Sequence, residues 1–438
     1  MEKFPYNKER FINELCLQTN MELKNALKTI IADFHERELP QLIHREINIP
    51  LNSNKIITLI GPRRAGKTYM LYQLMSKIKD KTNILYINFE DERLRFKPDE
   101  LQLIFDAYFE LYPEKKESEI YVFFDEVQEA EEWQSFVRRI YDTITKNIFL
   151  TGSSAKLLSK EIATSLRGRA ISYEILPLSF NEYLRFRGAE TNINSTKGRA
   201  RATNLLEEYL EKGGFPETVF MEEDVYKKTM QSYFEVMLYR DIIERYSISK
   251  PLAVKELLRH LLSQTGNEFS INKCYNDFKS RGLKISKDSL YNFVDYFDDA
   301  FIILPVENYS AKIRKQGLRK AYAIDTGLAS SLSFSLSKDI GRLMETAVMI
   351  ELKRRGKEIF YFKNGAECDF IIKEGRKINE AIQVCYEINK ENEAREINGL
   401  RKAMKTFGLK KGLLLTMNQE EKRNEIEIIP LLNWLLNA

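Results

Sequence analysis

Residues that bind metals through nitrogen or sulfur are scarce in this chain, which has four cysteines and three histidines among 438 residues. The cysteines are widely separated, without a CxxC pair: Cys16, Cys274, Cys368 and Cys385. Zinc domains and redox-active disulfides need such residues close together. We therefore expect no zinc cluster, and thiols that are reduced and mostly buried.

Long apolar segments are also absent. The longest runs, AFIILPV and IIPLLNWLL, fall well short of the roughly 18 residues that a membrane-spanning helix needs. The first ten residues, MEKFPYNKER, are charged and lack the apolar core of a secretory leader. These absences predict a cytoplasmic protein with no membrane partner.

Neither sign of charge dominates, because 68 lysines and arginines face 64 aspartates and glutamates, a formal net charge of +4. So small an excess of positive charge does not indicate a nucleic-acid partner. Evidence for nucleic-acid binding must therefore come from local basic patches. The chain is longer than one hydrophobic core normally serves, so we expect two to four domains.

Patterning along the chain divides it into five regions. A polar, helix-prone N-terminal extension ends at Pro40. Short apolar strands (IITLI, NILYINF, EIYVFFD, NIFLTG) then alternate with amphipathic segments, which is typical of a parallel α/β sheet. A stretch of helices follows, and after it three short helices and a β-hairpin, the pattern of a winged helix. The last region predicts a helix, three strands, a helix, two strands and a helix.

The predicted boundaries are 1–45 for the N-terminal extension, 46–185 for the α/β core, 186–247 for a helical lid, 248–335 for the winged helix and 336–438 for the C-terminal α/β domain.

The segment ITLIGPRRAGKTYM fits the phosphate-binding pattern GxxxxGK[ST], between an apolar strand and an amphipathic helix. In such a loop the backbone N–H groups and the helix N-terminus face the phosphates. Lys67 is expected to reach the β and γ phosphates, and Thr68 to place its hydroxyl on Mg²⁺. The predicted cofactors are therefore ATP and Mg²⁺. The predicted nucleotide-binding residues are Gly61, Pro62, Arg63, Arg64, Ala65, Gly66, Lys67, Thr68 and Tyr69.

A second apolar strand, EIYVFFDEVQ, delivers Asp125 and Glu126 at its carboxyl end. In a parallel sheet, ligands bind at that end. We expect Asp125 to hold Mg²⁺ through its water shell and Glu126 to polarise the attacking water. Adjacent carboxylates are usually a solvated turn, but the strand and the upstream loop favour the catalytic interpretation.

Hydroxyls and arginines near the following strands complete the predicted catalytic set. Thr151 or Ser153 is a candidate sensor of the γ-phosphate, although Ser153 and Ser154 fit a helix N-cap equally well. Arg167 and Arg169 are candidate arginine fingers, and an exposed basic turn is the alternative. The predicted catalytic residues are Lys67, Asp125, Glu126, Ser153, Arg167 and Arg169.

From about residue 45 to the end, the chain resembles a family of archaeal and bacterial AAA-type P-loop ATPases. The motifs that carry the resemblance are GPRRAGKT, FFDEVQ, FLTGSSAKLLS, LRGRA with LPLSFNEYL, and GGFPE. The resemblance implies a nucleoside-triphosphatase core in which Lys67, Thr68, Asp125 and Glu126 have the roles given above. It also implies that GGFPE belongs to the helical lid. The C-terminal domain of that family, of unknown function, comprises a winged helix and a restriction-endonuclease-like fold.

Basic residues in the winged-helix region are candidate DNA contacts, because phosphates are bound largely by Lys and Arg. One of these residues lies at the start of the third helix, and the others lie in the hairpin segment NYSAKIRKQGLRKAY. They are Lys287, Lys312, Arg314, Lys315, Arg319 and Lys320. The alternative interpretation of the hairpin is a solvated basic wing that does not bind DNA. Acidic residues at the far end of the third helix argue for a helix that enters a groove only partly, or that packs protein.

In the C-terminal domain, Glu345, Asp369 and Gln383 are candidate metal ligands, since metal-dependent nucleases bind Mg²⁺ through clustered carboxylates. Such sites also use a lysine, but Cys385 occupies its expected place. A buried thiol supplies no cation, and whether Lys363, Lys373 or Lys377 takes over is open. We therefore expect a degenerate nuclease-like domain, either a DNA-binding relic or a structural or protein-docking domain.

The sequence as a whole predicts Mg²⁺-dependent ATP hydrolysis coupled to conformational change, with double-stranded or branched DNA as a candidate partner. An ATP-coupled endonuclease is one alternative. A nucleotide-dependent regulatory switch that binds protein partners is the other, and assembly into oligomers is compatible with all three.

Overall fold

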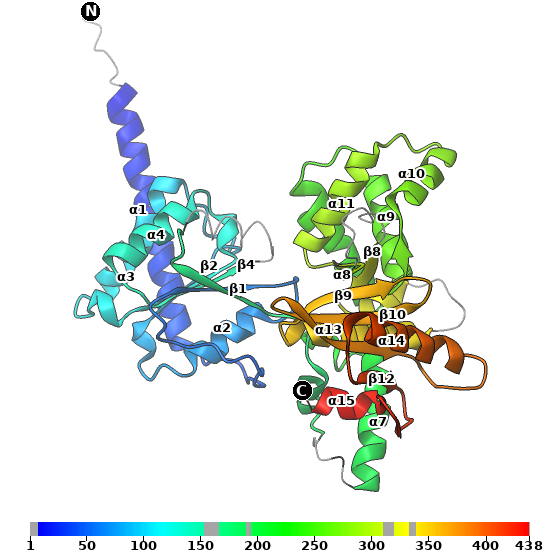
Figure 1. The fold of residues 1–438 in the computed structure, drawn as a ribbon. Helices are drawn as coiled ribbons and strands as arrows, with labels where there is room; N and C mark the ends of the chain where they lie inside the picture. The colour runs from blue at the N-terminus through cyan, green and yellow to red at the C-terminus, as the bar shows by residue number, and fades with distance from the viewer. Residues whose placement is uncertain are drawn as a thin grey trace, which may run out of the picture. The chain divides into compact units, whose positions relative to one another are not determined.

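The computed structural model describes residues 8–152, 166–189, 193, 195–309, 319–332 and 339–437, with side chains from residue 19 onward. The chain forms two compact units (Figure 1). The first comprises Met1–Gly61 and Lys67–Ile175, and the second comprises Pro62–Gly66 and Leu176–Ala438.

A five-stranded parallel sheet forms the centre of the first unit, in the order β2-β3-β4-β1-β5. Its strands are β1 (Ile56–Ile60), β2 (Ile84–Asn88), β3 (Tyr121–Asp125), β4 (Ile148–Gly152) and β5 (Ala170–Glu174). All residues of β1 and β4 are buried, which is why these strands are continuous apolar runs in the sequence. The predicted parallel α/β sheet is confirmed.

Helices pack around this sheet: α1 (Lys8–Glu36), α2 (Lys67–Met75), α3 (Leu103–Leu111) and α4 (Trp133–Thr143). Helix α1 ends before Pro40, as predicted, and it contacts α3 and β2. The two ring nitrogens of His35 lie 2.7 Å from the Tyr112 hydroxyl and 2.8 Å from the carbonyl oxygen of Ile84. The N-terminal helix therefore packs within the first unit.

The second unit begins with a helical region: α6 (Phe180–Phe186), α7 (Thr196–Lys212), α8 (Glu223–Val236) and the π-helix η6 (Met237–Glu244). Helix α6 starts at a capping box, in which Ser179 and Glu182 each accept a hydrogen bond from the other's backbone N–H. Helix α7 ends at Gly213, where φ is +76°. A Cβ atom at Gly213 would lie 2.1 Å from the Asp325 carboxylate, and the N–H of Gly214 donates to Asp325 over 2.7 Å. The glycines of the GGFPE motif thus allow the backbone to approach a buried acid.

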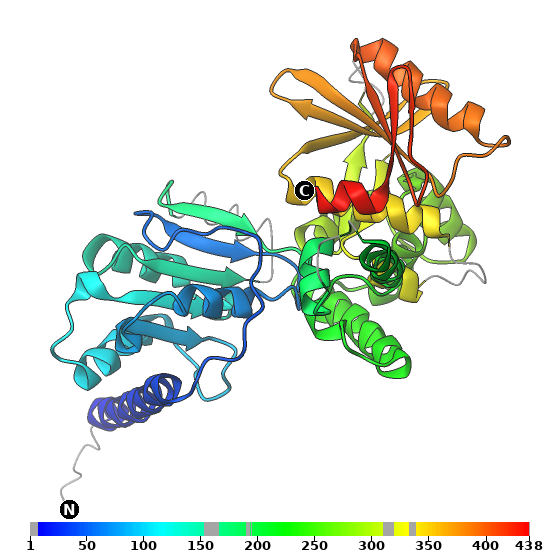
Figure 2. The same ribbon diagram turned by 90° about the horizontal axis from the view of Figure 1, so that it is seen from below.

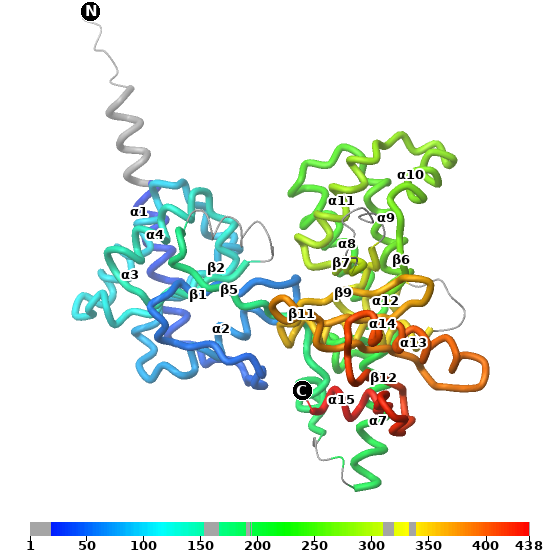
Figure 3. Tube along the Cα trace, in the orientation of Figure 1, coloured from blue at the N-terminus to red at the C-terminus, as the bar shows by residue number. Residues whose placement is uncertain are grey.

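Three helices and a small antiparallel sheet follow. The helices are α9 (Pro251–Ser263), α10 (Ile271–Ser280) and α11 (Lys287–Asp299). The sheet has the order β6-β8-β7, with β6 (Glu268–Phe269), β7 (Ile303–Glu307) and β8 (Arg319–Ala323), and α12 (Thr326–Leu332) comes next. The helices and the strands β6 and β7 are labelled in Figure 3. The three predicted helices and the hairpin strands are present, and β6 is an additional strand.

The C-terminal part contains a six-stranded mixed sheet in the order β13-β14-β12-β11-β10-β9. Helix α14 covers one face and α13 packs on the other (Figure 2). The elements are α13 (Ile340–Arg354), β9 (Glu358–Lys363), β10 (Glu367–Glu374), β11 (Lys377–Val384), α14 (Glu393–Phe407), β12 (Gly412–Thr416), β13 (Glu421–Arg423), β14 (Ile426–Pro430) and α15 (Leu431–Leu436). The short edge strand β13 was not predicted.

Across the described parts of the chain, no helix combines the length and the apolar character that crossing a membrane requires.

Candidate functional site

The loop between β1 and α2 depends on glycine at its first position. Gly61 has φ of +151°, and a Cβ atom there would lie 2.1 Å from the carbonyl oxygen of Ile175. The next glycine, Gly66, has φ of +94° and leads directly into α2. Only glycine takes such backbone angles without strain, so this part of the motif is required by the fold itself.

Lys67, the first residue of α2, is buried and turned back over the loop. Its ammonium donates a hydrogen bond to the carbonyl oxygen of Gly61 over 3.2 Å and lies 3.6 Å from a carboxylate oxygen of Glu126. The lysine and the acid predicted to act on a nucleotide are therefore neighbours in the first unit.

Asp125, at the end of β3, is the acceptor for three hydroxyl groups. Thr68 donates to it over 2.7 Å, Tyr86 over 3.1 Å, and Thr151 donates to its other oxygen. Burial raises the pKa of this carboxyl, and the hydrogen bonds from Thr151 and Thr68 oppose that rise. The predicted Mg²⁺ residues, Thr68 and Asp125, are in direct contact.

Glu126 lies next to Asp125 in a left-handed conformation, with φ of +50°. Its N–H donates to the Thr151 hydroxyl over 2.8 Å, and its carboxylate accepts a 2.6 Å hydrogen bond from the Gln128 side chain. This unusual backbone angle turns Glu126 away from the strand direction. Its carboxylate then lies near Lys67, as the salt-bridge distance shows.

Two residues that hydrogen-bond to Asp125 and Glu126 were not predicted from the sequence: Tyr86 and Gln128. Tyr86 is on β2, which follows the loop in sequence but pairs with β3 in space. Its contact with Asp125 depends on strand order, and nothing in the local sequence signals it. Gln128 follows Glu126 closely, but an amide after two acids is also common in ordinary turns.

Other predicted nucleotide-site residues are not gathered with this group. Ser153 lies outside the described residues. Arg169 forms two hydrogen bonds with Asp142, of 3.1 and 3.2 Å, and Arg167 is exposed. Tyr69 is 55% exposed and packs edge-on against Tyr72.

The two arginines of the phosphate-binding motif form ion pairs within the second unit, to which Pro62–Gly66 belong. Arg63 donates to Asp241 of the π-helix over 2.8 Å. Arg64 donates to Glu217 over 2.7 Å, and its guanidinium lies 5.0 Å from the centre of the Tyr233 ring. Asp241 is 4% exposed, so its pairing with Arg63 is shielded from solvent. Glu217 is the last residue of the GGFPE motif.

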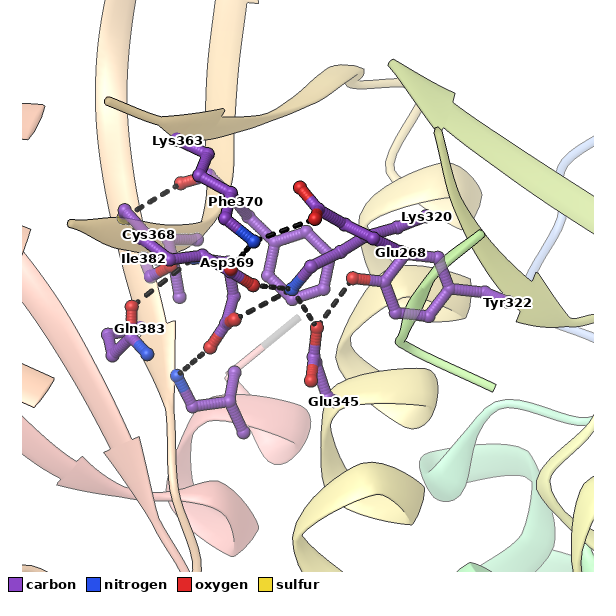
Figure 4. Close-up of polar contacts among 12 residues, drawn as sticks. Glu268, Lys320, Tyr322, Glu345, Lys363, Cys368, Asp369, Phe370, Ile382 and Gln383 are labelled. Atoms are coloured by element: carbon purple, nitrogen blue, oxygen red, sulfur yellow. Dashed lines mark hydrogen bonds and ion pairs between the residues drawn. The ribbon is translucent and has the colours of Figure 1, made fainter. Parts of the chain in front are cut away.

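A second cluster lies in the C-terminal part of the second unit, around Lys320 (Figure 4). The Lys320 ammonium is 2.9 Å from Glu345, 3.0 Å from Glu367 and 3.0 Å from Asp369. Its side chain is 3% exposed. The sequence made Lys320 a candidate DNA contact, with a solvated basic wing as the alternative. Both require an exposed side chain and are wrong for this residue, because β8 turns its side chain inward between the acids.

The predicted metal ligands of this domain have other partners. Asp369 and Glu345 contact Lys320, and the amide oxygen of Gln383 accepts a hydrogen bond from the Asp369 N–H over 3.2 Å. Within the described residues, no set of three or more His, Cys, Asp or Glu side chains is arranged to hold a metal ion. Burial raises the pKa of the Cys385 thiol to about 12, so it is not a thiolate at neutral pH. Cys274 and Cys368 are buried free thiols too.

The remaining candidate DNA residues are only partly described. Lys312, Arg314 and Lys315 lie outside the described residues. Arg319 is 3.4 Å from Glu307 and 3.8 Å from Asp295. Lys287 is exposed at the start of α11, with its ammonium 5.3 Å from the centre of the Tyr275 ring.

Comparison with protein families identifies three successive regions. Residues 53–184 match an AAA domain. Residues 203–339 and 340–434 match two domains of unknown function, DUF8612 and DUF4143.

Relatives match along almost the whole chain. The uncharacterized protein MJ1544 of Methanocaldococcus jannaschii is 41% identical, over 97% of this chain and 98% of its own length. An uncharacterized protein of Haemophilus influenzae is 29% identical, over 92% of this chain and 98% of its own length. Among solved structures, the Walker-type ATPase PABY2304 of Pyrococcus abyssi aligns with a TM-score of 0.41 at 18% identity, over 63% of this chain and 90% of that chain.

Proposed function

Because this chain belongs to the same family as MJ1544 of Methanocaldococcus jannaschii and carries an AAA domain, we propose that it is a Mg²⁺-dependent ATPase. The observation that carries the proposal is the meeting of Lys67, Thr68, Asp125 and Glu126 at the carboxyl ends of β1 and β3. These are the charges and the hydroxyl that phosphoryl transfer to water requires.

Each group has a role that its position supports. The backbone N–H groups of Gly61–Thr68 and the Lys67 ammonium bind the phosphates of ATP. Thr68 and Asp125 hold Mg²⁺, which neutralises charge on the phosphates. Glu126 orients and polarises the attacking water, with its backbone fixed by Thr151. Tyr86 and Thr151 hold the Asp125 carboxylate in place.

Arg167 is proposed as the arginine finger, from the same molecule or from a neighbour in an oligomer. Arg169 is a poorer candidate, because its guanidinium would first have to leave Asp142.

The helical region is proposed to respond to the nucleotide through the arginines of the loop. Arg63 pairs with Asp241 and Arg64 pairs with Glu217. The negatively charged phosphates of ATP would compete with these two carboxylates for the arginines. A π-helix such as η6, which carries Asp241, is a frequent feature of functional segments. ATP binding would thereby change the contacts of the helical region, and hydrolysis would restore them.

Double-stranded or branched DNA is the proposed partner of the second unit. Helices α9, α10 and α11 with the β6-β8-β7 sheet fit a winged helix, and the C-terminal mixed sheet fits a restriction-endonuclease-like fold. Exposed Lys287 at the N-terminus of α11 supports phosphate contact. A regulatory switch that binds protein is the alternative.

The decisive experiment measures phosphate release from ATP by the full chain, with Lys67→Ala as the inactive variant. Lys79→Ala is the control, because Lys79 is exposed and lies beyond the carboxyl end of α2, away from the proposed catalytic residues. Turnover that equals the Lys67→Ala rate would refute the ATPase proposal.

Adding duplex or branched DNA at two salt concentrations tests the partner. Stimulation that weakens at high salt supports DNA. Turnover that DNA leaves unchanged, together with no salt-sensitive binding, favours the protein-binding switch.

A further inference from the structure

The cluster around Lys320 joins two parts of the second unit that are distant in sequence. Lys320 comes from β8 of the three-stranded sheet, Glu345 from α13, and Glu367 and Asp369 from β10 of the six-stranded sheet. Tyr322, two residues after Lys320 on β8, also donates to Glu345, over 2.6 Å. Figure 4 shows the Lys320 and Tyr322 side chains pointing into the group of acids.

The hydrogen bonds of the Lys320 ammonium are complete without a metal. An ammonium has three donor hydrogens, and Lys320 has one carboxylate partner for each of them. The second oxygen of Asp369 accepts from the Val384 N–H over 3.0 Å. The second oxygen of Glu367 lies 3.1 Å from the Lys363 ammonium.

A divalent metal, which the proposed restriction-endonuclease-like fold implies, does not fit these residues. Mg²⁺ needs about six oxygen ligands at close range, whereas the point between Glu345 and Asp369 is filled by the Lys320 ammonium. Gln383 cannot complete the ligand set, because its amide bonds to the Asp369 N–H and, over 2.7 Å, to Glu396.

We propose that Lys320 is the resident cation of this domain, that it occupies the place of a divalent metal, and that the cluster joins the two sheets instead of cutting nucleic acid. The inference rests on the restriction-endonuclease-like fold in the proposed function, but not on ATP hydrolysis. The attraction between Lys320 and three acids is strong because the pairs are shielded from water. Two other contacts join the same two parts of the second unit. The hydroxyls of Thr265 and Thr346 are 3.0 Å apart, and Lys363 pairs with Glu268 over 2.7 Å.

The test uses thermal unfolding of the full chain without nucleotide, with EDTA or with millimolar Mn²⁺. Lys320→Met keeps much of the side-chain volume and removes the charge. The matched control is Lys363→Met, since Lys363 also pairs with Glu367 but is 44% exposed. A Lys320→Met/Asp369→Asn double variant shows whether a metal effect depends on the cluster.

We expect Lys320→Met to lower the Tm in EDTA far more than Lys363→Met does. Mn²⁺ should then raise the Tm of Lys320→Met, have no such effect on the wild type, and lose its effect in the double variant. If Lys320→Met had the same Tm as the wild type, the proposal that the cluster joins the two sheets would be refuted. A lowered Tm that Mn²⁺ does not restore would show that the ammonium does not stand in a metal site.

The wild type supplies a second measurement if Lys320→Met does not fold. Calorimetric titration with Mn²⁺ should give the same result for the wild type and for Asp369→Asn. Mn²⁺ binding or DNA cleavage by the wild type that Asp369→Asn abolishes would overturn the proposal. None of these measurements involves Lys67, so failure here is distinguishable from failure of the ATPase proposal.

Discussion

The hydroxyl of Thr68 donates a 2.7 Å hydrogen bond to the carboxylate of Asp125, although the residues are 57 positions apart in sequence. One lies at the start of α2 and the other at the end of β3. The parallel sheet brings these two ends together. In the proposed ATPase, the Thr68 hydroxyl would bind Mg²⁺ directly, and the Asp125 carboxylate would hold the ion through its water shell.

Thr68→Val should therefore raise the Mg²⁺ concentration at which ATP hydrolysis is half-maximal, by about 10- to 100-fold. Valine keeps the shape of threonine but has no oxygen ligand. Phosphate release measured across a Mg²⁺ titration checks this, with the exposed Thr143→Val as the control. An unchanged midpoint would mean that Thr68 is not a ligand.

Glu126→Gln should slow hydrolysis by about 10²- to 10⁴-fold, because an amide polarises water much less than a carboxylate does. ATP binding should persist, since Lys67 and the loop are unaltered. Single-turnover hydrolysis and equilibrium ATP binding separate the two effects. Glu129→Gln, an exposed acid three residues later, should behave as the wild type does. Equal losses of binding and hydrolysis would contradict the proposed role.

Asp241→Asn should tighten ATP binding by about five-fold, a gain of about 1 kcal/mol. The change removes the carboxylate that competes with phosphate for Arg63. Isothermal titration with a non-hydrolysable ATP analogue measures it. Glu244→Gln, an exposed acid on the same π-helix, is the matched control. Weaker binding by Asp241→Asn would show that Asp241 supports the loop instead of competing with the nucleotide.

Gly61→Ala should destabilise the first unit by roughly 3 kcal/mol, since the methyl group would overlap the Ile175 carbonyl and the backbone angle is strained for alanine. Gly168→Ala separates the two causes. Its φ is also positive, at +74°, but a Cβ atom there meets nothing within 4 Å. It should cost about 1 kcal/mol. Equal losses of unfolding free energy would contradict the steric explanation.

Asp325 should make the stability of the second unit depend on pH. Complete burial raises its pKa from 3.8 to about 6, even though the backbone N–H groups of Gly214 and Leu328 donate to it. The folded state therefore binds more protons than the unfolded state between about pH 4 and 6. The contribution of Asp325 to stability is complete below pH 4 and falls by up to about 3 kcal/mol as the pH rises past 6.

Asp325→Asn cannot ionise, so the difference in unfolding free energy between it and the wild type should change across this pH range. Chemical denaturation of both proteins from pH 4 to pH 7 measures the difference. A constant difference would mean that Asp325 has the same pKa in the folded and unfolded states.

The group of residues proposed to bind the nucleotide could be identified from the sequence because it lies in two short contiguous motifs. Gly61–Thr68 and Asp125–Glu126 follow apolar strands, and a parallel sheet places the ends of such strands at one edge. Tyr86 was not predictable, because its contact depends on the pairing of β2 with β3. The pairing of Arg63 with Asp241 joins residues 178 positions apart and has no local signal either.

The cluster around Lys320 shows a different limit of prediction from sequence. The sequence singled out Asp369 and Gln383 as candidate metal ligands and Cys385 in place of the expected lysine, but the cation of the cluster, Lys320, came from another sheet. Lys320 lies in a basic segment with Arg319 next to it. Strand alternation sends these neighbours to opposite sides, so one is buried among acids and the other faces Glu307 and Asp295. The composition of a charged segment does not reveal such a difference.

The ammonium of Lys320 also bears on how this protein can be divided. The two matched domains of unknown function meet between residues 339 and 340, yet Lys320 lies on one side of that boundary and its three carboxylates on the other. A fragment ending at 339 would keep a lysine without those counter-charges, and the complementary fragment would keep acids that repel one another. The two domains are therefore expected to melt in one transition, and expression of either one alone should yield an unstable product.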